Sequence, residues 1–593
     1  MTGLAEPAEM LALIAGAGVL ALDLETCSGP KAGMSLALNP RLGQVRILSL
    51  CDGKRSLVMD CFANPIQQLF PALESKILLV HNALFDLGWL YNLGLKNIPE
   101  CCCTYLLSQL IDGTDQDKGH HSLAECCKRW LNRNVDKTLQ ASDFSGQLEP
   151  RQIEYARRDV EVLPPLFQRL SEEIEKSGQL TTSEIELKAL PAWVWLVQSG
   201  VAFDQAAWLS LASKAESERD RLTRELDALA PAKEGQGLFG KCGDWNWASP
   251  QQVAEVFRQI GSPLKIEAKG HEFSTTNDAA LALCDHPMAE LLRQHREQAT
   301  LVKLYGPSTW LAEAAIEDER LYPGWRQIGT MTGRTTCRKP NVQQISRKPE
   351  YRACFVAPPG KILVKADYAT LQMRIACNQS RDQALFDVFE AEARGGPDVH
   401  MATAMRTLGK SKPSKADRQI AKSQNFGLLF GMSAEGLRIY ARTTYGVTFT
   451  AEEAVAHRRA FFKAYPGLEK WHQAARHGNQ QEARSRLGRR RRFWGNAPVT
   501  ELLNTPVQQD ESDGVKRAMG LLWQRRGCCP GAELVLMAHD ELVVSVAEDQ
   551  AETASEWLRE AMLDGMQPVL DPVPTAVDVK VCRDWSGRSA AGE

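Results

Sequence analysis

Two adjacent carboxylates, Asp540 and Glu541, interrupt a stretch of the sequence that is otherwise apolar. The stretch, residues 534–546 (LVLMAHDELVVSV), is rich in β-prone residues and contains neither Gly nor Pro. This pattern predicts a hairpin with buried arms and a polar tip that begins at His539. Because half-buried carboxylates that lie side by side repel each other, such a tip favours a bound cation. The alternative is a solvated polar turn without a chemical role.

A third carboxylate, Asp367, ends a second strand-like run at residues 361–368 (KILVKADY). Between the two predicted strands, two cations and two aromatic residues follow one another at intervals of four: Arg418, Lys422, Phe426 and Phe430. On a helix they form one slowly drifting face, where the cations suit a triphosphate and the rings suit a base. Two aspartates from separate strands beside a cationic helix predict a two-metal site for phosphoryl transfer. The alternative is a buried amphipathic helix with incidental charges.

Acidic residues also follow the apolar runs near the N-terminus. Residues 18–26 (GVLALDLET) predict a buried strand, and a spacing of two places Asp23 and Glu25 on one face of it. Residues 77–80 predict another strand, which leads to Asp86. An apolar strand that ends in such acidic residues is common, so this pattern alone does not establish a site.

A predicted helix at residues 152–163 (QIEYARRDVEVL) carries Tyr155 and Asp159 on one face at a separation of four. If Asp159 converges with the acidic groups of the two strands, their mutual repulsion calls for a bound metal. Mg²⁺ or Mn²⁺ suits such hard oxygen ligands.

The overall composition is that of a globular protein. The chain has 593 residues, of which 44% are hydrophobic and 24% charged, so we expect several domains. A net charge of −3 does not indicate nucleic-acid binding. Residues 484–492 (RSRLGRRRR) nevertheless form a local basic cluster of the kind that attracts a phosphate backbone. The apolar run at residues 10–22 follows acidic residues and is too short to span a bilayer, so we expect no signal peptide and no membrane association.

The sixteen cysteines do not form a metal or disulfide framework. They stand singly or next to one another, and none has the CxxC spacing of a zinc ribbon. His120 and His121 precede Cys126 and Cys127 closely, but one face of a helix explains this arrangement better than a metal site. We therefore expect a reducing, cytoplasmic compartment.

Four stretches in the middle of the chain have apolar residues at helical spacing but no catalytic groups: residues 184–204, 216–229, 246–261 and 293–305. They predict either a solvated helical domain or an arm that holds duplex DNA by its phosphates. Residues 332–345 (TGRTTCRKPNVQQI) are polar and cationic instead. Arg334, Asn341 and Gln343 are of the types that reach minor-groove acceptors, which every base pair presents in similar places. The alternative is a loop without such a role.

Three segments within residues 1–180 resemble the motifs of the DEDD 3′–5′ exonucleases, in the subclass whose last motif has Tyr four residues before Asp. They are DLET (23–26), HNALFD (81–86) and YARRD (155–159), and residues 121–132 and 137–144 also fall where that family has related segments. The resemblance implies an RNase H-like α/β domain in which four carboxylates bind two metal ions, namely Asp23, Glu25, Asp86 and Asp159. It also implies that Tyr155 orients the attacking water.

Residues 332–585 resemble the family A DNA polymerases, the type of bacterial DNA polymerase I, which has many phage relatives. The matching segments, in the expected order, are TGR…PNVQQI (332–345), KADYATLQMR (365–374), PDVH (397–400), RQIAKSQNFGLLFGMS (418–433), NTPVQQ (504–509), AHDE (538–541) and VKVCRDW (579–585). The resemblance implies a multidomain protein of α/β and α+β architecture, in which the exonuclease domain precedes a right-hand polymerase with palm, fingers and thumb.

The resemblance also sets the expected domain boundaries. These are an exonuclease domain at 1–180, a helical thumb and the start of the palm at 181–325, palm with the first catalytic motif at 326–396, fingers at 397–500 and palm with the second catalytic motif at 501–593. Because Asp23 lies almost at the start, we expect no 5′-nuclease domain ahead of the exonuclease.

By resemblance, the chain is a template-directed DNA polymerase in which the primer 3′-hydroxyl attacks the α-phosphorus of a dNTP in line. Asp367, Tyr368 and Asp540 are expected to hold two Mg²⁺ ions, with Mn²⁺ as an alternative, and Glu541 to support them. The expected dNTP contacts are Tyr368, Gln372, His400, Arg418, Lys422, Phe426 and Phe430. The expected contacts to primer–template DNA are Arg334, Asn341, Gln343, Asn504, Gln508 and His539. We expect a monomer that acts in DNA replication or repair in a bacterial cell or a phage-infected host.

Two positions depart from the family pattern together. The Glu that excludes a 2′-hydroxyl in the family is Gln372 here, and its usual partner, a Tyr, is Phe430. Because both have changed, neither a buried carboxylate nor a buried hydroxyl is left unpaired. We therefore expect Gln372 to keep the selection of deoxyribose, with weaker discrimination against ribonucleotides. Phe426, where some relatives carry Tyr, implies poor use of dideoxynucleotides.

A further departure lies on the expected template side. The QGTAAD segment of the family reads QQDESD at residues 508–513, and the segment after Arg492 is shorter than usual.

The sequence is also compatible with two other functions. One is a 3′–5′ exonuclease whose polymerase half binds DNA without catalysis, against which the presence of Asp367 and Asp540 argues. The other is a translesion or RNA-copying polymerase on the same fold, for which Gln372 and Phe430 leave room. The proofreading residues make a dedicated bypass enzyme the weaker expectation.

Overall fold

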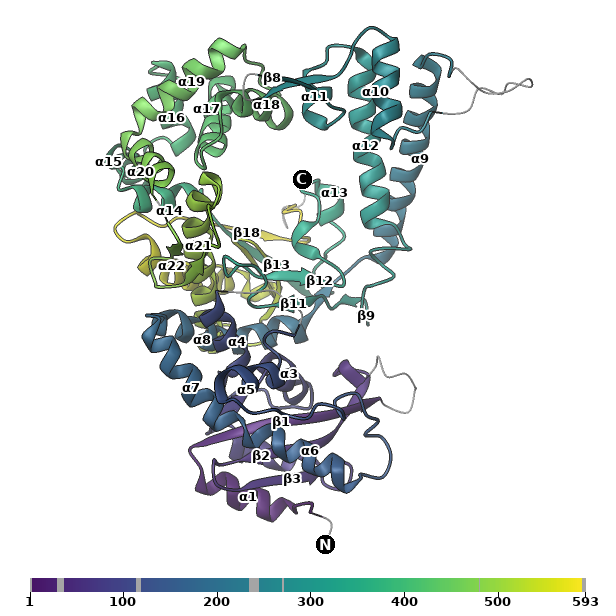
Figure 1. Cartoon of the computed structure of the whole chain (residues 1–593), viewed down its shortest axis with the longest axis vertical. Coiled ribbons are helices and arrows are strands. Elements are labelled where there is room, and N and C mark those ends of the chain that lie inside the picture. The colour runs from purple at the N-terminus through teal and green to yellow at the C-terminus, as the bar shows by residue number, and fades with distance from the viewer. Residues whose placement is uncertain are drawn as a thin grey trace, which may run out of the picture.

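The computed structural model describes residues 3–28, 37–113, 119–233, 245–268, 271–478 and 480–588. They form an N-terminal unit (residues 3–176) with a central sheet above it and two groups of helices above the sheet (Figure 1). We call these groups the helical arm (α9–α12) and the helical lobe (α14–α20).

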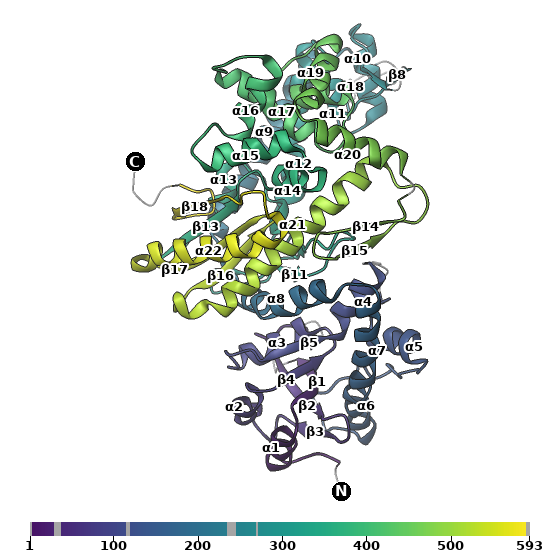
Figure 2. The same cartoon turned by 90° about the vertical axis from the view of Figure 1, so that its left-hand side faces the viewer.

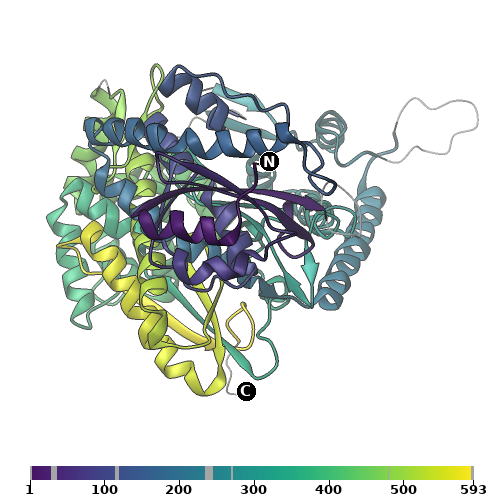
Figure 3. The same ribbon diagram turned by 90° about the horizontal axis from the view of Figure 1, so that it is seen from below.

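The N-terminal unit is built on a five-stranded sheet with the order β3-β2-β1-β4-β5. Its strands are β1 (Val19–Ser28), β2 (Gly43–Cys51), β3 (Ser56–Asp60), β4 (Ile77–Val80) and β5 (Glu100–Cys103). The helices around it are α1 (Pro7–Gly16), α2 (Phe70–Leu73), α3 (Ala83–Asn92), α4 (Thr104–Asp112), α5 (Leu123–Leu131), α6 (Pro150–Glu161) and α7 (Leu163–Lys176) (Figure 3). β1 runs antiparallel to β2 and parallel to β4, so the unit is the expected α/β domain.

The central sheet has four antiparallel strands in the order β16-β17-β13-β18. They are β13 (Lys361–Tyr368), β16 (Glu533–Ala538), β17 (Glu541–Ala547) and β18 (Val577–Cys582). The hairpin predicted at residues 534–546 is therefore confirmed, and its arms are buried. Two long helices pack beside the sheet, α21 (Val499–Gln524) and α22 (Ala551–Leu570). α8 (Leu180–Ser199) contacts α21, β16 and α3, and so joins the sheet to the N-terminal unit (Figure 2).

The helical arm is a pair of long helices, α9 (Gln205–Leu229) and α12 (Pro287–Tyr305), that pack along each other. At its end lie α10 (Pro250–Gln259), α11 (Asp278–Leu283), β7 (Lys265–Ala268) and β8 (His271–Ser274) (Figure 1). Ser249 caps α10 by accepting from the backbone N–H of Gln252. α9 begins well before the predicted residue 216, because Trp208, Ala212 and Ala215 continue its buried face.

The helical lobe consists of α14 (Leu371–Ser380), α15 (Gln383–Ala393), α16 (Val399–Leu408), α17 (Lys415–Leu428), α18 (Ala434–Tyr445), α19 (Ala451–Ala464) and α20 (Pro466–His477). α17 ends at Leu428, so Phe430 lies beyond the helix on which the spacing of four had placed it. α18 contacts α11 of the helical arm, and a guanidinium nitrogen of Arg442 lies 3.3 Å from Asp285 there. The arm and the lobe thus meet above the central sheet (Figure 1).

The remaining β-strands and the remaining α-helix are short: β6 (Val201–Ala202), β9 (Ile316–Glu317), β10 (Arg320–Leu321), β11 (Gly324–Arg326), β12 (Thr336–Arg338), α13 (Pro349–Arg352), β14 (Glu482–Arg484) and β15 (Arg490–Arg492). In the described part of the chain, every cysteine is a free thiol, and no helix is long and apolar enough to cross a bilayer.

Candidate active sites

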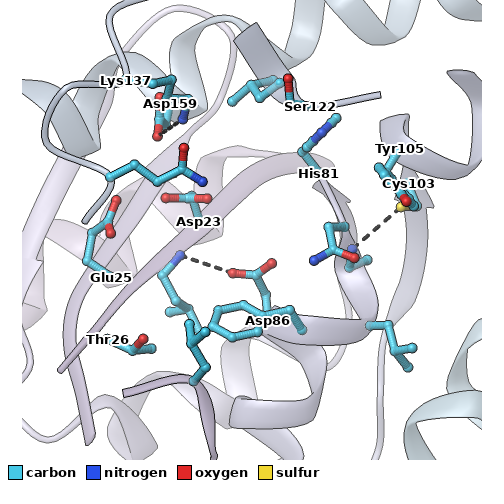
Figure 4. A pocket seen from close by; sticks show the side chains of 18 of the residues that line it. Asp23, Glu25, Thr26, His81, Asp86, Cys103, Tyr105, Ser122, Lys137 and Asp159 are labelled. Atoms are coloured by element: carbon cyan, nitrogen blue, oxygen red, sulfur yellow. Dashed lines mark hydrogen bonds and ion pairs between the residues drawn. The ribbon is translucent and has the colours of Figure 1, made fainter. Parts of the chain in front are cut away.

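The first acidic site lies in the N-terminal unit, where β1, α3 and α6 meet. Asp23 and Glu25 come from one face of β1, Asp86 from the first turn of α3 and Asp159 from α6. Oxygen atoms of Asp23, Glu25 and Asp159 lie within 4.8 Å of one another. A carboxylate oxygen of Asp86 accepts from the backbone N–H of Leu24 at 3.1 Å, which holds it beside this group (Figure 4). The structure thus brings together the four carboxylates that the sequence singled out.

Burial and mutual repulsion raise the pKa values of these carboxyls. Burial and the charge of Asp159 raise the pKa of Asp23 to about 7. Burial and Asp23 raise the pKa values of Glu25 and Asp86 well above their usual range. Groups that resist losing a proton for this reason gain most from a cation placed among them. The donor set, carboxylate oxygens from three elements, fits a hard divalent cation.

Lys137 is part of this site, although sequence reasoning named only the segment that contains it. Its Nζ lies 2.5 Å from an oxygen of Asp159 and donates to the Tyr155 hydroxyl at 3.2 Å. A lysine in a polar loop has no periodic signal, so only the resemblance of residues 137–144 pointed here. The ammonium partly compensates the charge of Asp159 and holds the Tyr155 hydroxyl through a hydrogen bond.

The site opens into a pocket of about 820 Å³. Besides the acidic residues, its lining includes Trp325 to Ile328, which belong to β11 and the segment after it. The pocket therefore lies where the N-terminal unit meets the rest of the chain. His81, also in the lining, is neutral near pH 7 because burial and Lys137 lower its pKa to about 3.

The second acidic site lies at the tip of the β16–β17 hairpin. Asp367 on β13 is the register partner of Glu541 on β17, and Asp540 immediately precedes that pair. Burial and the charge of Asp367 raise the pKa of Asp540 well above its usual range, so the two aspartates interact. Burial and Glu541 raise the pKa of Asp367 to about 6. His539 at the turn is exposed and has a left-handed backbone with φ of 61°.

Glu541 is buried, whereas the neighbouring Asp540 is half-buried. Its carboxylate accepts from the indole Nε1 of Trp585, and Lys365 Nζ and a nitrogen of Arg352 lie 3.4 and 3.8 Å from it. These contacts fasten the segment after β18 to the hairpin.

The predicted cationic face of α17 meets α16. Arg418 donates to Asp398 at 3.0 Å, and the rings of His400 and Phe426 are 5.4 Å apart. Burial and Arg418 lower the pKa of His400 to about 4, so this ring is neutral near pH 7. Lys422 Nζ lies 5.9 Å from the centre of the Tyr445 ring.

The side chains of the remaining nucleotide-site candidates, Tyr368, Gln372 and Phe430, turn in different directions. The Tyr368 hydroxyl donates to the backbone carbonyl of Met562 at 2.6 Å, so its side chain is buried against α22. Only the backbone of Tyr368 can face the hairpin tip. Gln372 instead donates through Nε2 to Glu511 on α21 at 3.1 Å. Phe430 packs in an apolar cluster with Trp471 and Leu503.

The candidate minor-groove residues already have partners within the chain. Both carboxylate oxygens of Glu511 accept from Nη2 of Arg334 at 2.6 Å. Asn341 caps the short turn that follows by accepting from the N–H of Gln343, whose own amide donates to Thr335. On α21, Gln508 accepts from the Thr332 hydroxyl at 3.0 Å, and Asn504 lies half-buried one turn earlier.

Comparison with known proteins agrees with this arrangement. The sequence model of "DNA polymerase family A" matches residues 214–587, and that of a "3'-5' exonuclease" matches residues 1–175. DNA polymerase I of Aquifex aeolicus is 29% identical over 562 residues, which cover 92% of this chain and 94% of that protein. The thermostable DNA polymerase I of Thermus filiformis is 32% identical over 75% of this chain, and the match spans 52% of that relative's length.

The fold has a close counterpart among solved structures. The polymerase domain of Pol1 from M. smegmatis, solved with DNA primer-template and dNTP, superposes with a TM-score of 0.76 over 98% of this chain and 99% of that one, at 22% identity. Because the family match covers most of the chain and includes both strands of the second acidic site, this chain belongs to DNA polymerase family A and carries a 3′–5′ exonuclease domain ahead of its polymerase domain.

Proposed function

We propose that this chain extends a primer on a DNA template and trims it from the 3′ end, each at one of the two acidic sites. The observation that carries the proposal is the meeting of Asp367 and Asp540 where β13 ends and the β16–β17 hairpin turns, together with the cations on one face of α17. The solved relative with primer-template and dNTP supports DNA and nucleotide as the substrates.

In the synthetic site, Asp367 and Asp540 would hold two Mg²⁺ ions, with the backbone carbonyl of Tyr368 as a further ligand. The ions would activate the primer hydroxyl and neutralise charge on the leaving pyrophosphate. Glu541, held by Trp585 and Lys365, would act by positioning the hairpin.

The nucleotide would lie between α17 and the sheet. Arg418 and Lys422 would contact the triphosphate, with His400 as a neutral hydrogen-bonding partner, because cations on one helix face suit clustered phosphate oxygens. Phe426 would contact the sugar and base, with Gln372 and Phe430 near the sugar. On the DNA side, we propose contacts from Arg334, Asn341, Gln343, Asn504, Gln508 and His539.

In the trimming site, Asp23, Glu25, Asp86 and Asp159 would hold two Mg²⁺ ions. Tyr155, whose hydroxyl receives a hydrogen bond from Lys137, would orient the attacking water. Placing the two chemistries at separate sites allows a mispaired 3′ end to leave one and enter the other.

The domain boundaries expected from the sequence remain our proposal: exonuclease at 1–180, thumb and start of the palm at 181–325, palm at 326–396 and 501–593, and fingers at 397–500. We further propose that the protein works as a monomer in the cytoplasm.

Paired alanine variants test the proposal. On a labelled primer–template, Asp540→Ala should abolish extension with dNTPs and leave 3′ trimming intact, and Asp23→Ala should do the reverse. Asp549→Ala, an exposed acid just after β17, is the matched control and should change neither activity. Extension that survives Asp540→Ala, or wild type that trims but never extends, would contradict the polymerase assignment. Equal extension on an RNA template would favour the RNA-copying alternative.

A further inference from the structure

Glu511 of α21 joins two side chains that come from distant parts of the chain. Its carboxylate accepts two contacts from Arg334 Nη2 at 2.6 Å and one from Gln372 Nε2 at 3.1 Å. The Glu511 side chain is 3% exposed, whereas that of Arg334 is 24% exposed. A buried carboxylate requires such partners, since an unpaired one would be strongly destabilising.

The contact fixes the orientation of Gln372. A carboxylate accepts hydrogen bonds only, so the amide must present its NH₂ end to Glu511. A hydrogen bond to a charged acceptor is stronger than one between neutral groups. Gln372 is therefore held in one orientation even though Phe430 offers it no polar group.

Glu511 also lies close to the catalytic hairpin. Its charge, after burial and Asp367, helps to raise the pKa of Asp540. Three elements thus meet around this carboxylate: the segment before β12 through Arg334, α14 through Gln372, and the hairpin tip through Asp540.

We propose that Glu511 is a specificity-determining positioning residue of the synthetic site, which holds Gln372 against the nucleotide sugar and Arg334 against the primer end as one rigid unit. The inference rests on the proposed polymerase function and deepens it. It assigns the sugar selectivity to a carboxylate on α21 that acts through Gln372. A fixed Gln372 leaves less room for a 2′-hydroxyl than a mobile one.

Single-turnover incorporation of dNTP and rNTP on one primer–template tests this. Glu511→Ala should lower the preference for dNTP over rNTP about tenfold, which corresponds to about 1.4 kcal/mol, mainly through faster rNTP incorporation. Glu511→Gln keeps the size but loses the charge and should give an intermediate ratio. Asp510→Asn is the matched control: this neighbouring buried carboxylate contacts Gln379 and Arg486 instead and should leave the ratio unchanged.

A double variant separates positioning from a general loss of structure. If Glu511 acts through Gln372, the ratio for Gln372→Ala/Glu511→Ala should equal that for Gln372→Ala alone, because changes in one contact pair are not additive. The rate of dNTP incorporation reports that the synthetic site of each variant is folded, and trimming reports the same for the exonuclease site. A ratio within about twofold of wild type in both Glu511 variants, or additive losses in the double variant, would overturn the inference while leaving the polymerase assignment in place. A wild-type chain that does not extend primers would overturn both.

Discussion

Lys137 and Asp159 form an ion pair in the exonuclease site, with 2.5 Å between the ammonium nitrogen and a carboxylate oxygen. Asp23 and Glu25 lie close to Asp159, and the ammonium partly offsets the rise in their pKa values (Figure 4). A metal ion that binds Asp159 must compete with this contact.

Replacing Lys137 with Ala should therefore lower thermal stability without metal and increase the stabilisation on adding Mg²⁺. The reason is that four carboxylates without a nearby cation repel one another, and Mg²⁺ relieves this repulsion. The measurement is the thermal midpoint of unfolding in EDTA and in saturating Mg²⁺. Lys128→Ala, an exposed lysine of α5, is the control. Equal Mg²⁺-induced shifts in wild type and Lys137→Ala would show that the ion pair does not limit metal binding.

Asp540 should lower the stability of the folded chain and be required for primer extension. Because burial and Asp367 raise its pKa, Asp540 destabilises the folded chain at any pH above the ordinary pKa of a carboxyl. Asp540→Asn should therefore raise the free energy of unfolding by about 1 kcal/mol in EDTA. The same change should reduce primer extension by about 10³-fold or more, as expected on loss of a charge that stabilises the transition state. Chemical denaturation and extension assays on one preparation check both. A variant that is less stable than wild type would contradict this account.

Removing one of the buried charges around Glu186 should lower the free energy of unfolding strongly. Glu186 of α8 accepts from Lys516, Arg489 and Gln327, and every carboxylate and cation of this group is at most 2% exposed. Removing one partner leaves buried charge uncompensated, so Glu186→Ala should cost about 3–5 kcal/mol in the free energy of unfolding. Replacing both Glu186 and Lys516 with apolar residues of similar size should cost less than Glu186→Ala. Urea denaturation of the three chains measures the difference, and a double variant less stable than Glu186→Ala would exclude this explanation.

Asp510 should make stability fall as the pH rises. Burial raises the pKa of this carboxyl to about 7, whereas in the unfolded chain it is about 3.9. At a pH between these two pKa values, Asp510 is protonated in the folded chain and ionised in the unfolded chain. The free energy of unfolding is therefore highest below the pKa of the unfolded chain and declines up to about pH 7. The full effect is at most about 4 kcal/mol. Asp510→Asn should remove this part of the slope, which denaturation at pH 5 and pH 7.5 tests. Parallel slopes in the two proteins would show that Asp510 ionises normally.

Much of both active sites follows from local sequence. Apolar, β-prone runs predict β1, β4 and the β16–β17 hairpin, and the acidic residues within or directly after these runs mark Asp23, Glu25, Asp367 and Asp540. This works because such runs favour buried strands, and a spacing of two places side chains on one face of a strand. The helical spacing likewise predicts α17 but not its end at Leu428, after which the chain turns through Gly431 with φ of 87°.

What the sequence alone determined is which short elements carry the candidate catalytic side chains, and the order of its motifs determined the family. Only the tertiary structure decided the partners of those side chains: Lys137 beside Asp159, Trp585 on Glu541, and Glu511 between Arg334 and Gln372. Each of these pairs joins residues far apart in the chain, so no local period encodes it. Such a pair forms where packing brings a buried charge within reach of a group that can compensate it.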